Sequence, residues 1–154
     1  MDPERDPEVD IKVDPEVDMD DRHQIIETLN LLAYLLDHRE WGRLDEVMTP
    51  DVEAYDEVGL PAVRDDKLRA LLGGCGPSQH LLGNYQVVVD GAAARSVCRV
   101  RVYHQGAGAR SDLFFEVFGE YHDDWVRTPD GWRMARRRLD TTIVRGDFET
   151  LQPG

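Results

Sequence analysis

The spacing of hydrophobic positions changes once along the chain, near residue 78. Before that point, apolar residues recur three or four positions apart, which is the spacing of one buried face of an α-helix. The clearest run is Ile25, Leu29, Leu32 and Leu36. Asp20 and Asp21 precede this run, and acidic residues favour the start of a helix. The pattern therefore predicts a first helix that ends near His38–Arg39.

Two shorter helices and one strand are predicted between the first helix and residue 73. A helix is expected around residues 40–48, where Thr49-Pro50 closes it, and a strand or extended piece at 52–56. The third helix is expected near residues 64–72. Helical character then ends at residues 73–77, because glycine and proline do not continue a helix.

From residue 78 onward the pattern is typical of long β-strands. The predicted strands cover residues 79–89, 92–104, 113–126 and 132–144. Asp90-Gly91 is a strong hairpin signal, and Pro129-Asp130-Gly131 provides a second turn. Helices followed by a meander of strands indicate an α+β fold with an antiparallel sheet. Gly83 and Gly119 mark positions where the long strands are expected to bend.

The length of 154 residues suits a single domain, since two would each lack a sufficient core. No stretch is long and apolar enough to cross a bilayer, and Met1 leads into acidic residues rather than an export signal. We therefore expect a cytoplasmic protein without a membrane partner. Cys75 and Cys98 are expected to be free thiols, and no metal site is expected because no cysteine and histidine spacing matches a zinc motif.

The net charge of −13 argues against a nucleic-acid partner, because phosphate binding requires a basic surface. Residues 1–21 hold ten acidic and two basic residues, a net charge of −8, which leaves −5 for residues 22–154. This segment repeats Asp-Pro-Glu-Val-Asp and is poor in large apolar residues, so residues 1–20 are expected to form a flexible acidic tail. An edge strand or a docking motif is the alternative. The domain is then expected at 21–148, with a C-terminal tail at 149–154.

Three motifs resemble those of the SnoaL-like group in the nuclear-transport-factor-2-like (NTF2-like) superfamily. The first is Leu-Asp-His-Arg-Glu-Trp-Gly-Arg-Leu at 36–44, followed by Pro-Asp-Val at 50–52. The second is Ser-Gln-His-Leu-Leu-Gly-Asn at 78–84, followed by Val-Val-Val-Asp-Gly at 87–91. The third is Tyr-His-Asp-Asp-Trp at 121–125, followed by Asp-Gly-Trp-Arg at 130–133. The resemblance implies a cone, in which three N-terminal helices pack into a strongly curved antiparallel sheet around a small-molecule pocket. This superfamily includes dehydratases, isomerases, cyclases, dehydrochlorinases and non-catalytic binders, so the fold alone does not assign an activity.

Within that group the chain is most similar to scytalone dehydratase-like proteins. The resemblance implies that Asp37 orients His80, which acts as a base, and that His104 and Arg137 also belong to the site. The carbonyl-polarising tyrosines of scytalone dehydratase match Leu36 and Asp56 here, and Tyr55 lies one residue away. The group that polarises a substrate is therefore left open.

The residues themselves give a chemical reason for pairing Asp37 with His80. Asp37 falls in the last turn of the predicted helix, where the helix dipole disfavours a carboxylate. An aspartate on one imidazole nitrogen fixes the tautomer and leaves the other nitrogen free to accept a proton. An exposed helix-end acid and a satisfied core histidine are the alternatives. Alternation places His80 on one strand face with Leu82, Asn84 and Val88.

The remaining candidates are less specific. His104 is in phase with Val100 and Val102, and is expected to be a second acid or a polar clamp, or else a structural histidine. Alternation sends Arg137 to the face opposite Arg136 and Arg138, where it binds an anionic or enolate oxygen, or else pairs with an acid. The other substrate-binding candidates are Asp56 and three aromatic residues that are expected to be core or pocket wall, Trp41, Tyr55 and Phe118.

We therefore expect a cofactor-independent acid–base enzyme that acts on a hydrophobic small molecule, in the setting of polyketide-type natural products that the resemblance implies. It is a lyase of the dehydratase type, an isomerase or a cyclase, and these share a first proton abstraction that the sequence does not resolve. The alternative is a non-catalytic binding or assembly subunit. A homo-oligomer, dimer or trimer, is expected because apolar residues fall on the outer strand faces. These residues are Val97, Phe115, Val117, Tyr121 and Met134.

Overall fold

The computed structural model describes residues 19–154, so the acidic segment at 1–18 and the expectations placed on it lie outside the described residues. Helix α1 spans Met19–Asp37 and ends within two residues of the position that the sequence predicts. Its predicted apolar face is buried, because Ile25, Leu29, Leu32 and Leu36 each expose 2% or less of their surface. None of the helices in this part of the chain is long and apolar enough to span a membrane.

Asp21, in the first turn of α1, connects the helix to the sheet through hydrogen bonds. Its carboxylate accepts two hydrogen bonds from the Arg127 guanidinium, at 2.8 and 2.6 Å, and one from the Trp132 indole at 2.9 Å. Charge-assisted bonds of this kind fix a direction as well as a distance. This end of α1 is therefore held while the opposite end carries Asp37.

The other helical segments before the long strands are short and irregular. A 3₁₀-helix, η1, spans Trp41–Glu46, and residues 60–72 form one continuous segment of three parts. These parts are α2 at Leu60–Ala62, a π-helical turn η2 at Val63–Leu68 and α3 at Arg69–Leu72. Helical segments thus lie near the predicted positions, but only α1 is a long regular α-helix.

One six-stranded sheet carries the rest of the chain, in the order β2-β1-β6-β5-β4-β3. The strands are β1 (Met48–Ala54), β2 (Glu57–Val58), β3 (Ser78–Asp90), β4 (Ala93–Gln105), β5 (Phe114–Thr128) and β6 (Gly131–Gly146). The last four agree with the predicted strands to within two residues at each end, and they pair antiparallel. The strand expected at 52–56 begins earlier, at Met48, and pairs parallel with β6. Pro50 has no N–H to donate, and the β1–β6 ladder is interrupted there, between Met48 and Glu53.

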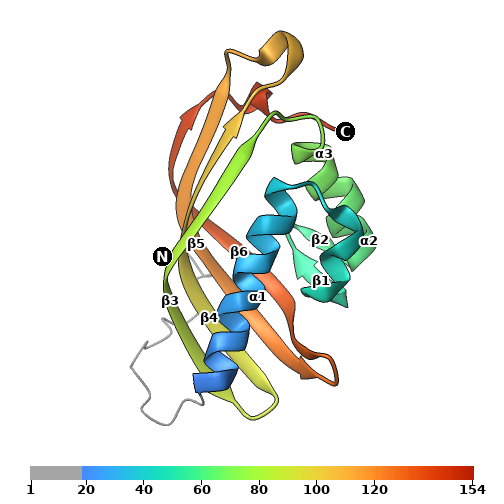
Figure 1. Cartoon of the computed structure of the whole chain (residues 1–154), viewed down its shortest axis with the longest axis vertical. Coiled ribbons are helices and arrows are strands. Elements are labelled where there is room, and N and C mark those ends of the chain that lie inside the picture. Colours follow the sequence, from blue (N-terminus) through green and yellow to red (C-terminus); the bar gives the residue numbers. More distant parts are fainter. Residues whose placement is uncertain (1–18) are drawn as a thin grey trace, which may run out of the picture.

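The sheet curves, and the helices lie on one side of its long strands (Figure 1). The ladders shift register at three places along the long strands, in β3 between Gly83 and Gln86 and in the β5–β6 pair next to Gly119 and Trp125. At Gly119 an added Cβ would clash with the carbonyl oxygen of Asp140, so this approach of β5 to β6 requires glycine. Bulges bend and twist the strands that carry them. The predicted bends at Gly83 and Gly119 thus coincide with two of the shifts.

Two expectations about strand faces are wrong, and the register shift in β3 accounts for the first of them. His80 and Leu82 point toward the helices as predicted, but after the shift Tyr85, Val87 and Val89 take over that face from Asn84 and Val88. The apolar surface predicted on the outer face is also wrong in large part. Tyr121 and Met134 belong to the main core, and Phe115 and Val117 form a second buried cluster with Val102.

The C-terminal residues 149–154, expected as a tail, pack against the end of α3. The backbone N–H of Gly74 donates to the Gln152 carbonyl at 2.8 Å, and that of Gln152 donates to the Leu71 carbonyl at 3.0 Å. Thr150 is fully buried. A side chain at Gly73 or Gly74 would clash with the backbone of this segment, so the glycines that end α3 also make room for it.

Candidate functional site

Asp37 and His80 are hydrogen-bonded side chain to side chain. The last residue of α1 and the third residue of β3 meet with Oδ1 of Asp37 at 2.6 Å from Nδ1 of His80. The backbone N–H of His80 donates to the other carboxylate oxygen at 2.8 Å. The hydroxyl of Ser78 donates to Oδ1 at 2.8 Å. Three donors therefore hold the carboxylate in one orientation.

These donors decide the charge state of Asp37. Burial by itself raises the pKa of the carboxyl, but the hydrogen bonds from His80 and Ser78 outweigh burial and hold the pKa below its ordinary value. The carboxylate is ionised at neutral pH, so Nδ1 of His80 carries the proton that it shares with Asp37. The other ring nitrogen, Nε2, makes no hydrogen bond with any residue between 19 and 154. It presents a lone pair from a side chain that is only 5% exposed.

His104 on β4 lies edge-on to His80, with 6.1 Å between the ring centroids. As predicted, it shares the inward face with Val100 and Val102. Its Nδ1 lies 2.9 Å from the carbonyl oxygen of Phe115, so Nδ1 is the donor and Nε2 is an acceptor. Burial lowers the pKa of His104 to about 4, against the opposing effect of the Phe115 carbonyl. His104 is therefore neutral at physiological pH.

Arg137 on β6 forms a separate group. Its guanidinium donates to both carboxylate oxygens of Asp123, at 2.7 and 2.8 Å, and both side chains are almost fully buried. Although burial alone lowers the pKa of Arg137, the neighbouring Asp123 charge holds that pKa above its usual range. The guanidinium stacks 3.5 Å from the ring centroid of Tyr121 and donates a longer bond, 3.4 Å, to the Tyr55 hydroxyl. No hydrogen bond joins this group to His80 within the described part of the chain.

The sequence analysis missed Asp123, although a signal for it existed. Asp123 is in phase with Tyr121 and Trp125 along β5, an inward-facing set, and an acid at such a position requires a cation. Arg137 is directly opposite in the ladder. Ser78 was also missed as a partner of Asp37.

The other predicted site residues are dispersed. Tyr55 and Asp56 form the turn between β1 and β2, both with positive φ, and Asp56 is exposed. Trp41 opens η1 and packs half-buried against the main core. Phe118 lies on the sheet face opposite His80, where the Arg101 guanidinium sits 4.8 Å from its ring centroid. Phe118 therefore does not contribute to the cluster around His80.

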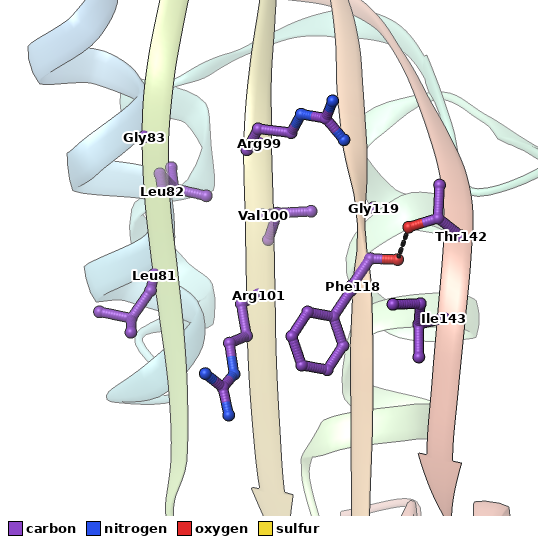
Figure 2. A pocket seen from close by; sticks show the side chains of 10 residues that line it. All are labelled: Leu81, Leu82, Gly83, Arg99, Val100, Arg101, Phe118, Gly119, Thr142 and Ile143. Carbon is purple, nitrogen blue, oxygen red and sulfur yellow. Dashed lines mark hydrogen bonds between the residues drawn. The ribbon is translucent and has the colours of Figure 1, made fainter.

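A groove of about 380 Å³ lies on that opposite face (Figure 2). Leu81, Phe118 and Ile143 supply apolar side chains to it, and Arg99 and Arg101 border it. Asp37, His80 and His104 are not among its lining residues. It is thus a feature of the outer sheet surface, distinct from the Asp37–His80 pair.

Metal ligands are not grouped within residues 19–154, where no set of three or more histidine, cysteine, aspartate or glutamate side chains has a metal-binding arrangement. Cys75 and Cys98 are free thiols.

Comparisons with known proteins identify the family. The sequence model of the SnoaL-like domain matches residues 17–138, which is most of the chain. An uncharacterized protein of Mycobacterium tuberculosis is 36% identical over 127 residues, 78% of this chain and 84% of that protein.

Two solved structures show the same fold. A candidate scytalone dehydratase from Novosphingobium aromaticivorans is 21% identical and superposes with a TM-score of 0.74, over 82% of this chain and 87% of that one. A nuclear transport factor 2 (NTF2-like) superfamily protein from Salmonella enterica is 16% identical, with a TM-score of 0.71 over 81% of this chain and 93% of that one. The structure is thus an α+β fold of the NTF2-like type, and the chain belongs to the SnoaL-like domain family.

Proposed function

We propose that this protein is a cofactor-independent enzyme that abstracts a proton from a hydrophobic small molecule, with His80 as the base. The observation that carries the proposal is the 2.6 Å hydrogen bond between Asp37 and Nδ1 of His80. This bond fixes the tautomer in which Nε2 has a free lone pair, and the aspartate stabilises the imidazolium that forms on proton transfer.

The first step is common to three reactions. Nε2 of His80 takes the proton from a carbon next to a carbonyl, and the electron pair moves onto the carbonyl oxygen as an enolate. In dehydration the enolate expels a β-hydroxyl group, which leaves as water with the proton from His80. In isomerisation the proton returns to another carbon, and in cyclisation the enolate attacks a second carbonyl. We favour the dehydration, because the motif positions of Asp37, His80 and His104 resemble those of scytalone dehydratase-like proteins.

His104, Arg137 and Tyr55 are suited to different contacts with a substrate. Nε2 of neutral His104 is an acceptor, so it suits a substrate hydroxyl rather than an oxyanion. Arg137 is already neutralised by Asp123, which makes it a poor binder of a second anion. The Tyr55 hydroxyl accepts from Arg137, so its own proton is free to be donated to a carbonyl oxygen.

The side chains beside His104 support a hydrophobic class of substrate. The ring of Phe115 lies 5.9 Å from that of His104, and Phe115 belongs to the buried apolar cluster with Val102 and Val117. A polar base and acceptor next to an apolar wall suit a largely hydrophobic molecule with a few oxygens, such as a polyketide-type hydroxy ketone.

The experiment is an exchange assay on a panel of cyclic β-hydroxy ketones in D₂O, followed by NMR for deuterium uptake next to the carbonyl and for loss of water. His80→Gln is expected to lower the rate by roughly 10²–10⁴-fold, the range for removal of a general base. Asp37→Asn is expected to lower it as well, because an amide favours the wrong tautomer. His38→Gln is the matched control, since His38 is exposed at the end of α1 and bonds to the Tyr34 carbonyl.

Equal rates in His80→Gln and the natural protein would refute the catalytic role of His80. Saturable binding of a hydroxy ketone without any exchange would instead favour a non-catalytic binding subunit.

A further inference from the structure

Arg39 occupies an unfavourable backbone position directly after α1. The helix ends in a Schellman motif, in which the N–H of Glu40 donates to the Leu35 carbonyl at 2.9 Å and that of Arg39 to the Leu36 carbonyl at 3.3 Å. This motif places Arg39 in the left-handed region, with φ of 58°. Glycine is the usual residue there, because a Cβ atom is disfavoured in that conformation. An arginine at this position therefore suggests a use for its side chain.

The Arg39 side chain connects the end of α1 to the start of β3. The guanidinium donates to the Leu36 carbonyl at 2.5 Å, to the Ser78 hydroxyl at 2.8 Å and to the Gly76 carbonyl at 2.9 Å. The Ser78 hydroxyl in turn donates a hydrogen bond to Oδ1 of Asp37, the same oxygen that accepts from His80. The contacts thus run in one line from Arg39 through Ser78 and Asp37 to His80.

We infer that Arg39 is a positioning residue for the proposed base, acting through Ser78 to fix Asp37 and opposing the protonation of His80. The inference rests on the proposed function, in which His80 must be neutral before it accepts a proton. Asp37 alone favours the imidazolium, and so does the negative end of the α1 dipole. A cation connected to the same carboxylate through Ser78 offsets both effects.

Within residues 19–154, the charged and titratable groups near His80 come from three elements. Asp37 on α1 and His104 on β4 contact its ring, and Arg39, in the segment that follows α1, is connected to it through Ser78 and Asp37. His104 is neutral, so Arg39 is the only one of the three that can counter the Asp37 charge. Arg39 is half-buried, which limits screening of its charge by salt.

The test is an NMR titration of the His80 ring in the full chain, which requires no substrate. In Arg39→Gly the titration midpoint of His80 is expected to move up by roughly 1 pH unit, the lower end of the effect of a neighbouring charge. Arg39→Lys keeps the charge but loses the three-way contact, so a smaller upward shift is expected. Asn84→Gly is the matched control, because Asn84 is exposed and also has a positive φ, 53°.

An unchanged midpoint in Arg39→Gly, or an equal shift in Asn84→Gly, would overturn the inference. If Arg39→Gly does not fold, Ser78→Ala breaks the same line of contacts while Arg39 keeps its two carbonyl partners, and His80 must again titrate at higher pH. This result is separable from the exchange assay: a His80→Gln variant with full activity would remove the proposed function while the titration shift could still be observed.

Discussion

Burial of His104 makes the stability of the folded protein depend on pH. The pKa of His104 is about 4 in the folded state, below the 6.5 of an exposed histidine. Between these values the unfolded chain binds a proton that the folded chain does not, so stability falls as the pH falls. The group contributes nothing to this dependence well above pH 6.5, where it is neutral in both states.

We therefore expect His104→Asn to flatten the pH dependence. Between pH 7 and pH 5 the natural protein should lose about 2 kcal/mol of unfolding free energy through this one group, and the variant should not. Asparagine retains a donor for the Phe115 carbonyl, although the smaller side chain lowers stability at both pH values. Urea unfolding at the two pH values measures the difference, with His38→Gln as an exposed control. Parallel pH dependences in His104→Asn and the natural protein would contradict the expectation.

At the scale of single residues, the sequence predicted the histidines of the site better than the residues that hold them in place. His80 and His104 are on inward strand faces and Asp37 ends the amphipathic helix, so periodicity and the family motifs were enough to bring the three together. Arg39 and Ser78 reach the site through the helix-end geometry and a side-chain contact between residues 39 positions apart. Neither feature leaves a periodic trace in the sequence.

At the scale of the elements, the antiparallel register of β5 and β6 creates the buried ion pair. Asp123 and Arg137 are directly opposite each other in the ladder, and this pairing allows the two hydrogen bonds between their side chains. Removal of one partner leaves the other charge buried and unpaired, which is far more costly than losing an exposed pair.

Asp123→Asn is accordingly expected to lower the free energy of unfolding by about 3–5 kcal/mol. The neighbouring Asp124→Asn is the control, because Asp124 faces the other way and its 3.6 Å contact with Arg95 is exposed. That change should cost about 1 kcal/mol or less. Urea unfolding at pH 7 gives both values. Similar losses in the two variants would mean that the buried pair does not stabilise the β5–β6 register.

Element boundaries were predictable, whereas strand faces were not predictable throughout. The turn residues at 90–91 and 129–131 fix where the long strands end, and those ends agree with the structure. Face assignment by strict alternation fails beyond Asn84, because the register shift there inverts every later side chain of β3. A shift of this kind depends on the pairing with β4. The parallel pairing of β1 with β6 likewise joins strands that are distant in the sequence.

For the whole molecule, the one-sided placement of the helices leaves the other face of the sheet uncovered by the described residues (Figure 1). Leu81 and Ile143 are 53% and 51% exposed on that face, and Phe118 lies between them in the groove (Figure 2). The expected homo-oligomer stays a prediction, but its interface residues change. Leu81, Phe118 and Ile143 replace Phe115, Val117, Tyr121 and Met134, which are buried inside.

We expect identical chains to associate through this groove, because exposed apolar side chains that lie close together are usually covered by a partner. Light scattering at micromolar concentration should then give a multiple of the 17.6 kDa chain mass. Phe118→Glu replaces the apolar ring between Leu81 and Ile143 with a charged side chain and should lower the mass to that of one chain. Val58→Glu is the control, since Val58 is an apolar residue with 70% exposure on β2, at the far edge of the sheet. A natural protein with a mass of 17.6 kDa would refute the association, and an equal effect of Val58→Glu would move the interface away from the groove.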